Sequence, residues 1–377
     1  MKKIIIFLFS IMLITCCNSQ NKQDDLYPIK MNNGKYGYIN SVGKVIIEPK
    51  FYYALDFSEG LAAIREKGYY GYIDKTGQFV IPPNFEDAGK FKDGIAIVTT
   101  KEDKKVYINT KGEMIDIKLE QYYKLNKFNE GLSIIKTKNG FGYIDTKGNV
   151  VVSPQYKTAY NFENGLALVS KNGTNFGYIN KSGKYVIEPK YYIATSFSNG
   201  LAAVKDSGFK TKFLNKEGKE VLEIKSSYTC DNFSEGLAIF YEEGKGYGYV
   251  NKNGDIVIKP NSKFETLMSF KEGVARFSTK NEVGYIDKNG KILFKISKDY
   301  FLGYVSNGMI PFYKRRERLS QSRYGFMNIR GEVKVKPQYK EVEPFKGNLA
   351  RIHLSQGFNG YYVYINKEGN VIEPKKY

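Results

Sequence analysis

A tripeptide that recurs ten times along the chain is the sequence feature that most constrains its fold. The tripeptide is Gly-Tyr-Ile or a variant of it, and successive copies lie 34 to 41 residues apart in a chain of 377 residues. Its central aromatic residue is Tyr38, Tyr72, Tyr107, Tyr143, Tyr178, Phe213, Tyr249, Tyr285, Phe326 or Tyr364. A regular period of this length is typical of a repeat protein, in which each unit packs mainly against its neighbours.

One unit, residues 60–90, predicts a small antiparallel sheet. Its expected strands are residues 61–65, 69–73 and 78–81. We expect Pro82 and Pro83 to end the third strand, because proline cannot donate a hydrogen bond to a sheet. Residues 85–91 then form either a fourth strand or the connection to the next unit, so each unit is a meander of three or four strands.

Both faces of these strands are apolar. In the first strand Leu61 and Ala63 point to one face, and Ala62 and Ile64 point to the other. A sheet that is covered on one side only would alternate apolar and polar residues. We therefore expect each unit to be sandwiched between its two neighbours, because a single unit cannot bury both faces alone.

A glycine precedes the aromatic residue in seven units, and Val106, Lys212 and Val363 replace it in the other three. The seven glycines are Gly37, Gly71, Gly142, Gly177, Gly248, Gly284 and Gly325. Glycine inside a strand often marks a place where another backbone or a ring approaches closely. We therefore interpret these glycines as structural positions of the repeat.

The repeats predict an all-β protein, a tandem array of about ten antiparallel units of three to four strands each. We favour an open, curved array or solenoid, because β-propellers usually have about 4–8 blades. The alternative is a propeller-like ring, or two smaller rings, because the chain begins and ends at nearly the same point of the repeat.

The repeat resembles that of the WG repeat (KWG repeat) proteins. Their unit reads approximately Phe-x-x-Gly-Leu-Ala, then Lys-Trp-Gly-Tyr-Ile-Asp, then Ile-Pro-Pro, and the resemblance extends over nearly all of residues 26–377. The tryptophan of the family motif is replaced here by Tyr36, Tyr70, Phe141, Phe176, Tyr247 and Tyr324. The resemblance implies a repeat architecture and an association with bacterial envelope or secreted proteins, and it implies no catalytic residue.

The N-terminus resembles a bacterial lipoprotein signal. Lys2 and Lys3 precede an apolar run over residues 4–14, which is too short to span a bilayer. Cys16 or Cys17 then offers the acylation site. We predict a signal peptide over residues 1–16, a polar tether over 17–25 and the repeat array over 26–377. Lipid would anchor the protein in the bacterial cell envelope, at the outer membrane or the cell surface, and simple secretion is the alternative.

The chain is basic, with 58 Lys and Arg against 39 Asp and Glu. Most of these basic residues are lysine, which recurs in turns, where it keeps a loop solvated. The alternative is attraction to an anionic surface. Nucleic acid is not an expected partner. A denser basic loop lies in the longest interval between repeats, and we interpret it as a candidate contact for an anion or an acidic partner. Its residues are Lys314, Arg315, Arg316, Arg318 and Arg323.

No motif for catalysis, cofactor binding or metal binding is recognisable, and the chain has one histidine. We therefore expect a non-catalytic, monomeric scaffold that binds a protein or polysaccharide and needs no cofactor. The alternative is a carbohydrate-active enzyme on envelope or extracellular glycans, because two catalytic carboxylates need only be close in space. An enzyme would need residues that break the repeat pattern and converge.

Overall fold

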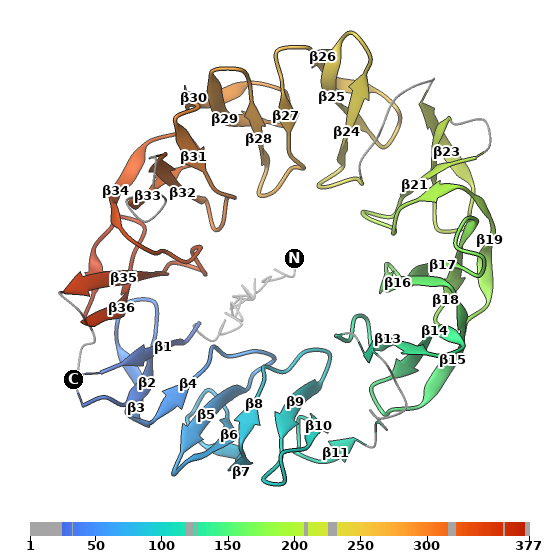
Figure 1. Ribbon diagram of the computed structural model, residues 1–377. Helices are drawn as coiled ribbons and strands as arrows, with labels where there is room; N and C mark the ends of the chain where they lie inside the picture. The colour runs from blue at the N-terminus through green and yellow to red at the C-terminus, as the bar shows by residue number, and fades with distance from the viewer. Residues whose placement is uncertain are drawn as a thin grey trace, which may run out of the picture.

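The computed structural model is a closed ring of ten small antiparallel sheets (Figure 1). It describes residues 25–373 except 32, 116, 118–123, 126, 207–209, 225–231, 316–321 and 357–358, and within them it contains no helix. Strands follow one another in chain order within each sheet, so each sheet is a meander, here called a blade. The all-β tandem repeat predicted from the sequence is confirmed.

Seven blades have four strands and three have three strands. The first five blades are β1–β3 (Tyr27–Lys30, Tyr36–Ile39, Val45–Phe51), β4–β7 (Tyr53–Ala54, Ala62–Glu66, Tyr69–Ile73, Phe79–Phe85), β8–β11 (Asp87–Ala88, Ile95–Thr99, Lys105–Asn109, Met114–Ile115), β12–β15 (Lys124–Leu125, Leu132–Thr137, Gly140–Asp145, Val150–Tyr156) and β16–β19 (Thr158–Glu163, Leu166–Ser170, Phe176–Asn180, Tyr185–Tyr191). The other five are β20–β23 (Ile193–Ala194, Ala202–Lys205, Thr211–Leu214, Glu220–Ile224), β24–β26 (Leu237–Glu242, Gly246–Asn251, Ile256–Asn261), β27–β30 (Thr266–Leu267, Val274–Ser278, Glu282–Asp287, Ile292–Ser297), β31–β34 (Tyr300–Leu302, Met309–Lys314, Tyr324–Asn328, Val333–Tyr339) and β35–β37 (Ala350–Gln356, Asn359–Ile365, Val371–Ile372).

The short strand at the start of a blade resolves the alternative left open for residues 85–91. Within that segment, β8 pairs with β9, which belongs to the following unit. The segment is thus both a strand and a connection, because it leaves one blade and adds the first strand to the next.

A tight turn before the second strand of each four-stranded blade points towards the centre of the ring (Figure 1). In β4–β7 it consists of Glu59 and Gly60, and both residues have positive φ, 52° and 83°. Positive φ at both central residues is the type I′ geometry that closes two-residue hairpins. The Glu59 carboxylate accepts hydrogen bonds from the backbone N–H groups of Asp93 (2.7 Å) and Gly94 (2.9 Å) in the next such turn. We call these the inner turns, and their hydrogen bonds join neighbouring blades.

The prolines lie inside strands, so the prediction that Pro82 and Pro83 end a strand is wrong. Both belong to β7, which runs from Phe79 to Phe85. A bulge makes this possible, since the register passes from Tyr72↔Ile81 to Tyr70↔Phe85. The extra residues of a bulge need no partner on the neighbouring strand, and β7 is an edge strand, so the missing N–H groups of proline break no ladder.

The repeat glycines face this bulge. A Cβ atom at Gly71 would lie 2.6 Å from the carbonyl oxygen of Ile81 and 2.7 Å from the backbone nitrogen of Pro83. Gly37, Gly142, Gly177 and Gly325 meet the equivalent atoms at 2.4 to 2.9 Å. Any side chain at these positions would therefore collide with the backbone of the next strand of the same blade.

The hydrophobic core is divided among the joints between blades. One cluster combines Tyr38 and Ile47 of the first blade with Ala62 and Ile64 of the second. Tyrosines of the repeated tripeptide also donate their hydroxyl hydrogens to backbone carbonyls of the following blade, at 2.6–2.8 Å. These donors are Tyr38, Tyr72, Tyr143, Tyr178, Tyr249 and Tyr285. Each of these joints therefore buries apolar surface from two blades and adds a hydrogen bond between them.

The same kinds of contact close the ring, so the favoured open array is corrected to the alternative of a single ring. Tyr364 of the last blade donates a hydrogen bond to the carbonyl of Pro28 (3.2 Å), and Tyr27 donates one to that of Lys346 (2.9 Å). The rings of Tyr27 and Tyr364 are 5.5 Å apart. Asp56 forms ion pairs with both Lys346 and Lys90. The first and last blades bury each other's apolar faces, which an open array would leave exposed.

Candidate functional site

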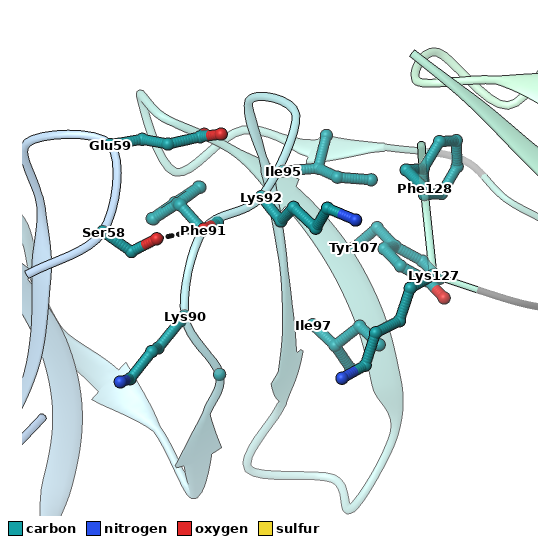
Figure 2. Close-up of a pocket in the computed structure, with 11 residues that line it drawn as sticks. Ser58, Glu59, Lys90, Phe91, Lys92, Ile95, Ile97, Tyr107, Lys127 and Phe128 are labelled. Carbon is teal, nitrogen blue, oxygen red and sulfur yellow. Dashed lines mark hydrogen bonds between the residues drawn. The ribbon is translucent and has the colours of Figure 1, made fainter. Parts of the chain in front are cut away.

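A hollow among the described residues lies where the inner turns of three consecutive blades meet (Figure 2). It has a volume of about 520 Å³, within the usual range of ligand sites. We call it the inner groove. Its lining residues are Ser58, Glu59, Gly89, Lys90, Phe91, Lys92, Ile95, Ile97, Tyr107, Lys127 and Phe128.

The inner groove lies at an interface between blades where the aromatic rings are farther apart than at most other interfaces. In seven other joints the aromatic residue of the tripeptide packs on a phenylalanine of the next blade, with centroids 4.7–4.9 Å apart. The corresponding pair here, Tyr107 and Phe128, is 5.9 Å apart. Within the described part of the chain, the Tyr107 hydroxyl also has no hydrogen-bond partner. Burial raises the pKa of Tyr107, so its hydroxyl remains a potential donor towards the groove.

The walls of the inner groove are apolar. Ile95, Tyr107 and Phe128 are buried, whereas Ile97 is 43% exposed. An exposed isoleucine beside buried aromatic rings can pack against an apolar group of a ligand.

The rim of the inner groove is cationic. Asp56, Lys90 and Lys127 occupy the same repeat position, directly before the phenylalanine of the inner turn, in three consecutive blades. Asp56 and Lys90 form an ion pair of 2.7 Å across their joint. At the next joint the equivalent neighbours are Lys90 and Lys127, which extend in the same direction from the two sides of the groove (Figure 2). Lys127 has no ion-pair partner among the described residues.

Two polar side chains of the inner groove already form hydrogen bonds within the ring. The Glu59 carboxylate already accepts two backbone hydrogen bonds, and Ser58 donates its hydroxyl to the carbonyl of Phe91 at 2.7 Å. Neither side chain has a histidine or second carboxylate beside it among the lining residues. The described residues contain no group of three or more His, Cys, Asp or Glu that could hold a metal ion.

The basic loop predicted from the sequence lies in another blade. Lys314 ends β32, and Arg315 follows it. Arg323 precedes β33, so these residues flank the connection between the two paired strands. Arg316 and Arg318 lie outside the described residues, as do Cys16 and Cys17. Lys314, Arg315 and Arg323 do not line the inner groove.

Sequence reasoning missed the inner groove. Phe128 follows Tyr107 by 21 positions, but Phe270 follows Tyr249 by 21 as well, and that pair is only 4.8 Å apart. Val106 replaces the usual glycine, but so does Lys212 in a unit whose aromatic pair is 4.9 Å apart. Neither feature of the sequence therefore identifies the joint with the wider spacing. The three lysines could be recognised as a cluster only once the blades were placed side by side.

A protein-family model described as "WG containing repeat" matches the chain in seven segments that together cover more than half of it. They are residues 36–70, 70–104, 141–174, 176–208, 213–245, 247–282 and 324–353. No curated protein sequence matches the chain. None of the described residues forms a helix long and apolar enough to cross a membrane.

Several solved structures are similar to the fold at low sequence identity. A structure titled as a eukaryotic initiation factor is 12% identical, with a TM-score of 0.48 over 82% of this chain and 95% of that one. BamB from Moraxella catarrhalis is 10% identical, with a TM-score of 0.35 over 77% and 96%. The extracellular domain of a putative one-component system from B. thetaiotaomicron is 9% identical, with a TM-score of 0.31 over 93% and 65%.

Proposed function

The chain belongs to the family of WG-containing repeat proteins, and on that premise we propose that it is a non-catalytic binding scaffold for an acidic protein segment. The inner groove receives this segment, and an N-terminal lipid holds the ring at the bacterial cell envelope. Recognition without turnover fits a fold whose units all serve to build one rigid ring.

The observation that carries the proposal is the row Asp56, Lys90 and Lys127. A carboxylate of the partner would lie between Lys90 and Lys127, in the place that Asp56 occupies one joint earlier. An aliphatic or aromatic side chain next to it would pack on Ile97 and Tyr107. The expected recognition sequence therefore combines Asp or Glu with a large apolar residue.

A peptide-display selection against the purified full-length chain tests the groove. We expect the selected peptides to be rich in Asp or Glu beside an apolar residue. Lys127→Ala and Ile97→Ser should each weaken their binding at least tenfold, and added salt should weaken binding to the unmodified protein. Both side chains are exposed, so the fold should persist, as unfolding temperatures can verify.

A matched control separates the inner groove from the basic loop. Replacing Arg315, Arg316, Arg318 and Arg323 by Gln removes more charge than Lys127→Ala but leaves the groove intact. If only the loop variant lost the selected peptides, the contact would belong to the loop. Selected peptides without an acidic bias would also contradict the proposal.

The lipid anchor has its own test. Replacing both Cys16 and Cys17 by Ser should move the protein from the membrane fraction to the soluble fraction and abolish labelling by a fatty-acid analogue. A protein that stays on the membrane without label would contradict lipid anchoring. A soluble, unlabelled parent protein would instead support secretion.

A further inference from the structure

A second hollow, on the opposite side of the fifth and sixth blades from their inner turns, differs from the inner groove in its chemistry. It has a volume of about 450 Å³ and lies between β16–β19 and β20–β23. We call it the outer pocket. It is lined by Asn175, Pro189, Lys190, Tyr191, Tyr192, Asp206, Lys212 and Glu220.

Two residues of the outer pocket break the repeat. Lys212 stands where seven units have glycine and two have valine. Glu220 stands at the third-strand position that is apolar in all nine other units. The residues at that position elsewhere are Val45, Phe79, Met114, Val150, Tyr185, Ile256, Ile292, Val333 and Val371. A polar side chain at either position is therefore an exception in this molecule.

The two exceptions meet in space. The Lys212 ammonium lies 3.2 Å from the Glu220 carboxylate and 3.1 Å from that of Asp206. This convergence is possible because β23 contains no proline and pairs with β22 through Lys212↔Glu223 without the wide bulge. The space that the bulge fills beside Gly177 is thus available to the Lys212 side chain.

The remaining wall of the outer pocket comes from the preceding blade. The Tyr192 ring is 53% exposed and offers an apolar face, and Asn175 adds an amide. Lys190 and Lys212 balance the charges of Asp206 and Glu220, so the pocket has no net charge. A balanced pocket favours a polar, uncharged ligand, in contrast to the cationic rim of the inner groove.

We propose that the outer pocket binds a neutral sugar residue of a glycan. The Tyr192 ring would pack on the C–H face of the sugar, and the two carboxylates, the Lys212 ammonium and the Asn175 amide would bind its hydroxyls. In this proposal the pocket binds the sugar without cleaving it, because the Lys212 ammonium already forms ion pairs with both carboxylates. This inference does not depend on the acidic ligand of the inner groove.

Saturation-transfer NMR with the purified full-length chain tests this proposal. The probes are linear neutral oligosaccharides of glucose, mannose, galactose and N-acetylglucosamine. At least one of them should bind at millimolar concentration or better. Tyr192→Ala should weaken its binding at least tenfold, and so should the double variant Lys212→Gly/Glu220→Val, which restores the residues common in other units.

Matched variants keep the result interpretable. Tyr160 is also an exposed tyrosine of the same blade but does not line the outer pocket, so Tyr160→Ala should bind the sugar like the parent chain. Lys127→Ala in the inner groove should also leave sugar binding unchanged. The proposal is overturned if no neutral oligosaccharide binds, if Tyr192→Ala and the double variant bind as tightly as the parent, or if the bound sugar is cleaved.

Discussion

The blades β16–β19 and β8–β11 have the same four-stranded order but differ in how they use their third and fourth strands. In β16–β19, Gly177 faces the backbone of Ile187 and Pro189, and β19 is a seven-residue bulged strand. In β8–β11, Val106 replaces the glycine, and β11 has two residues and no proline. The glycine and the proline are therefore present together in one blade, and the sequence of the other has neither at these positions.

This difference indicates how a repeat ring can acquire a binding site. A glycine with a bulge fills the space beside the neighbouring strand of its own blade with backbone and leaves no room there for a side chain. The inner groove adjoins the blade with Val106, and the outer pocket adjoins the blade with Lys212. Both candidate binding sites thus adjoin blades in which the repeat glycine is replaced by another residue.

The largest expected effect comes from forcing a side chain into a regular blade. Gly142→Val would place a Cβ 2.5 Å from the carbonyl oxygen of Val152 and should lower the free energy of unfolding by about 3 kcal/mol. The reverse change, Val106→Gly, should cost less, about 1–2 kcal/mol, because it removes a partly buried apolar side chain and adds a flexible glycine but creates no clash. Urea unfolding of both variants measures the difference, and equal effects would refute the link between glycine and bulge.

A smaller effect is expected from the tyrosine hydroxyls. Tyr178→Phe removes the 2.7 Å hydrogen bond to the carbonyl of Thr195 and should cost about 1–2 kcal/mol, because that carbonyl loses its partner. Tyr107→Phe should cost less than about 0.5 kcal/mol, because no partner of this hydroxyl is present in the described residues. Thermal unfolding can compare the two variants. A cost for Tyr107→Phe as large as that for Tyr178→Phe would mean that the joint at the inner groove is closed in solution.

The smallest effect concerns the joint that closes the ring. Burial tends to raise the pKa of Asp56, but the ion pairs with Lys346 and Lys90 outweigh it and hold that pKa below its usual value of 3.8. A lowered pKa in the folded state stabilises the protein above about pH 4, and this stabilisation is lost as the pH falls through the lowered value. Asp56→Asn should therefore cost about 1 kcal/mol at pH 7 and progressively less below pH 4.

Unfolding temperatures of Asp56→Asn at pH 7 and pH 3 check this dependence. Glu332 is a suitable control, because its ion pair with Lys334 lies within one blade. Glu332→Gln should not measurably change the unfolding temperature at pH 7. A cost for Asp56→Asn that stays the same at both pH values would show that the ion pairs do not strengthen the closure.

Most of the blade could be predicted from the sequence, because its signals are local. The strands around Leu61 and Tyr72 follow from apolar residues bounded by turn residues, and the apolar character of both faces predicts stacking. The proline prediction was wrong because a bulge depends on the partner strand, which a linear sequence does not display. The inner groove was missed because Lys90 and Lys127 are 37 positions apart and become neighbours only when their blades stack.

By itself, the sequence determined the repeat, its all-β character and the positions where the repeat is broken, because each of these depends on residues within about one period. Only the tertiary structure decided that ten blades close into one ring, because closure depends on the small rotation between neighbouring blades and on contacts between residues such as Tyr27 and Tyr364. The tertiary structure also decided which of the residues that break the repeat pattern contact each other. Lys212 and Glu220 are separate irregularities in the sequence, and the pairing of β22 with β23 turns them into one charged contact beside the outer pocket.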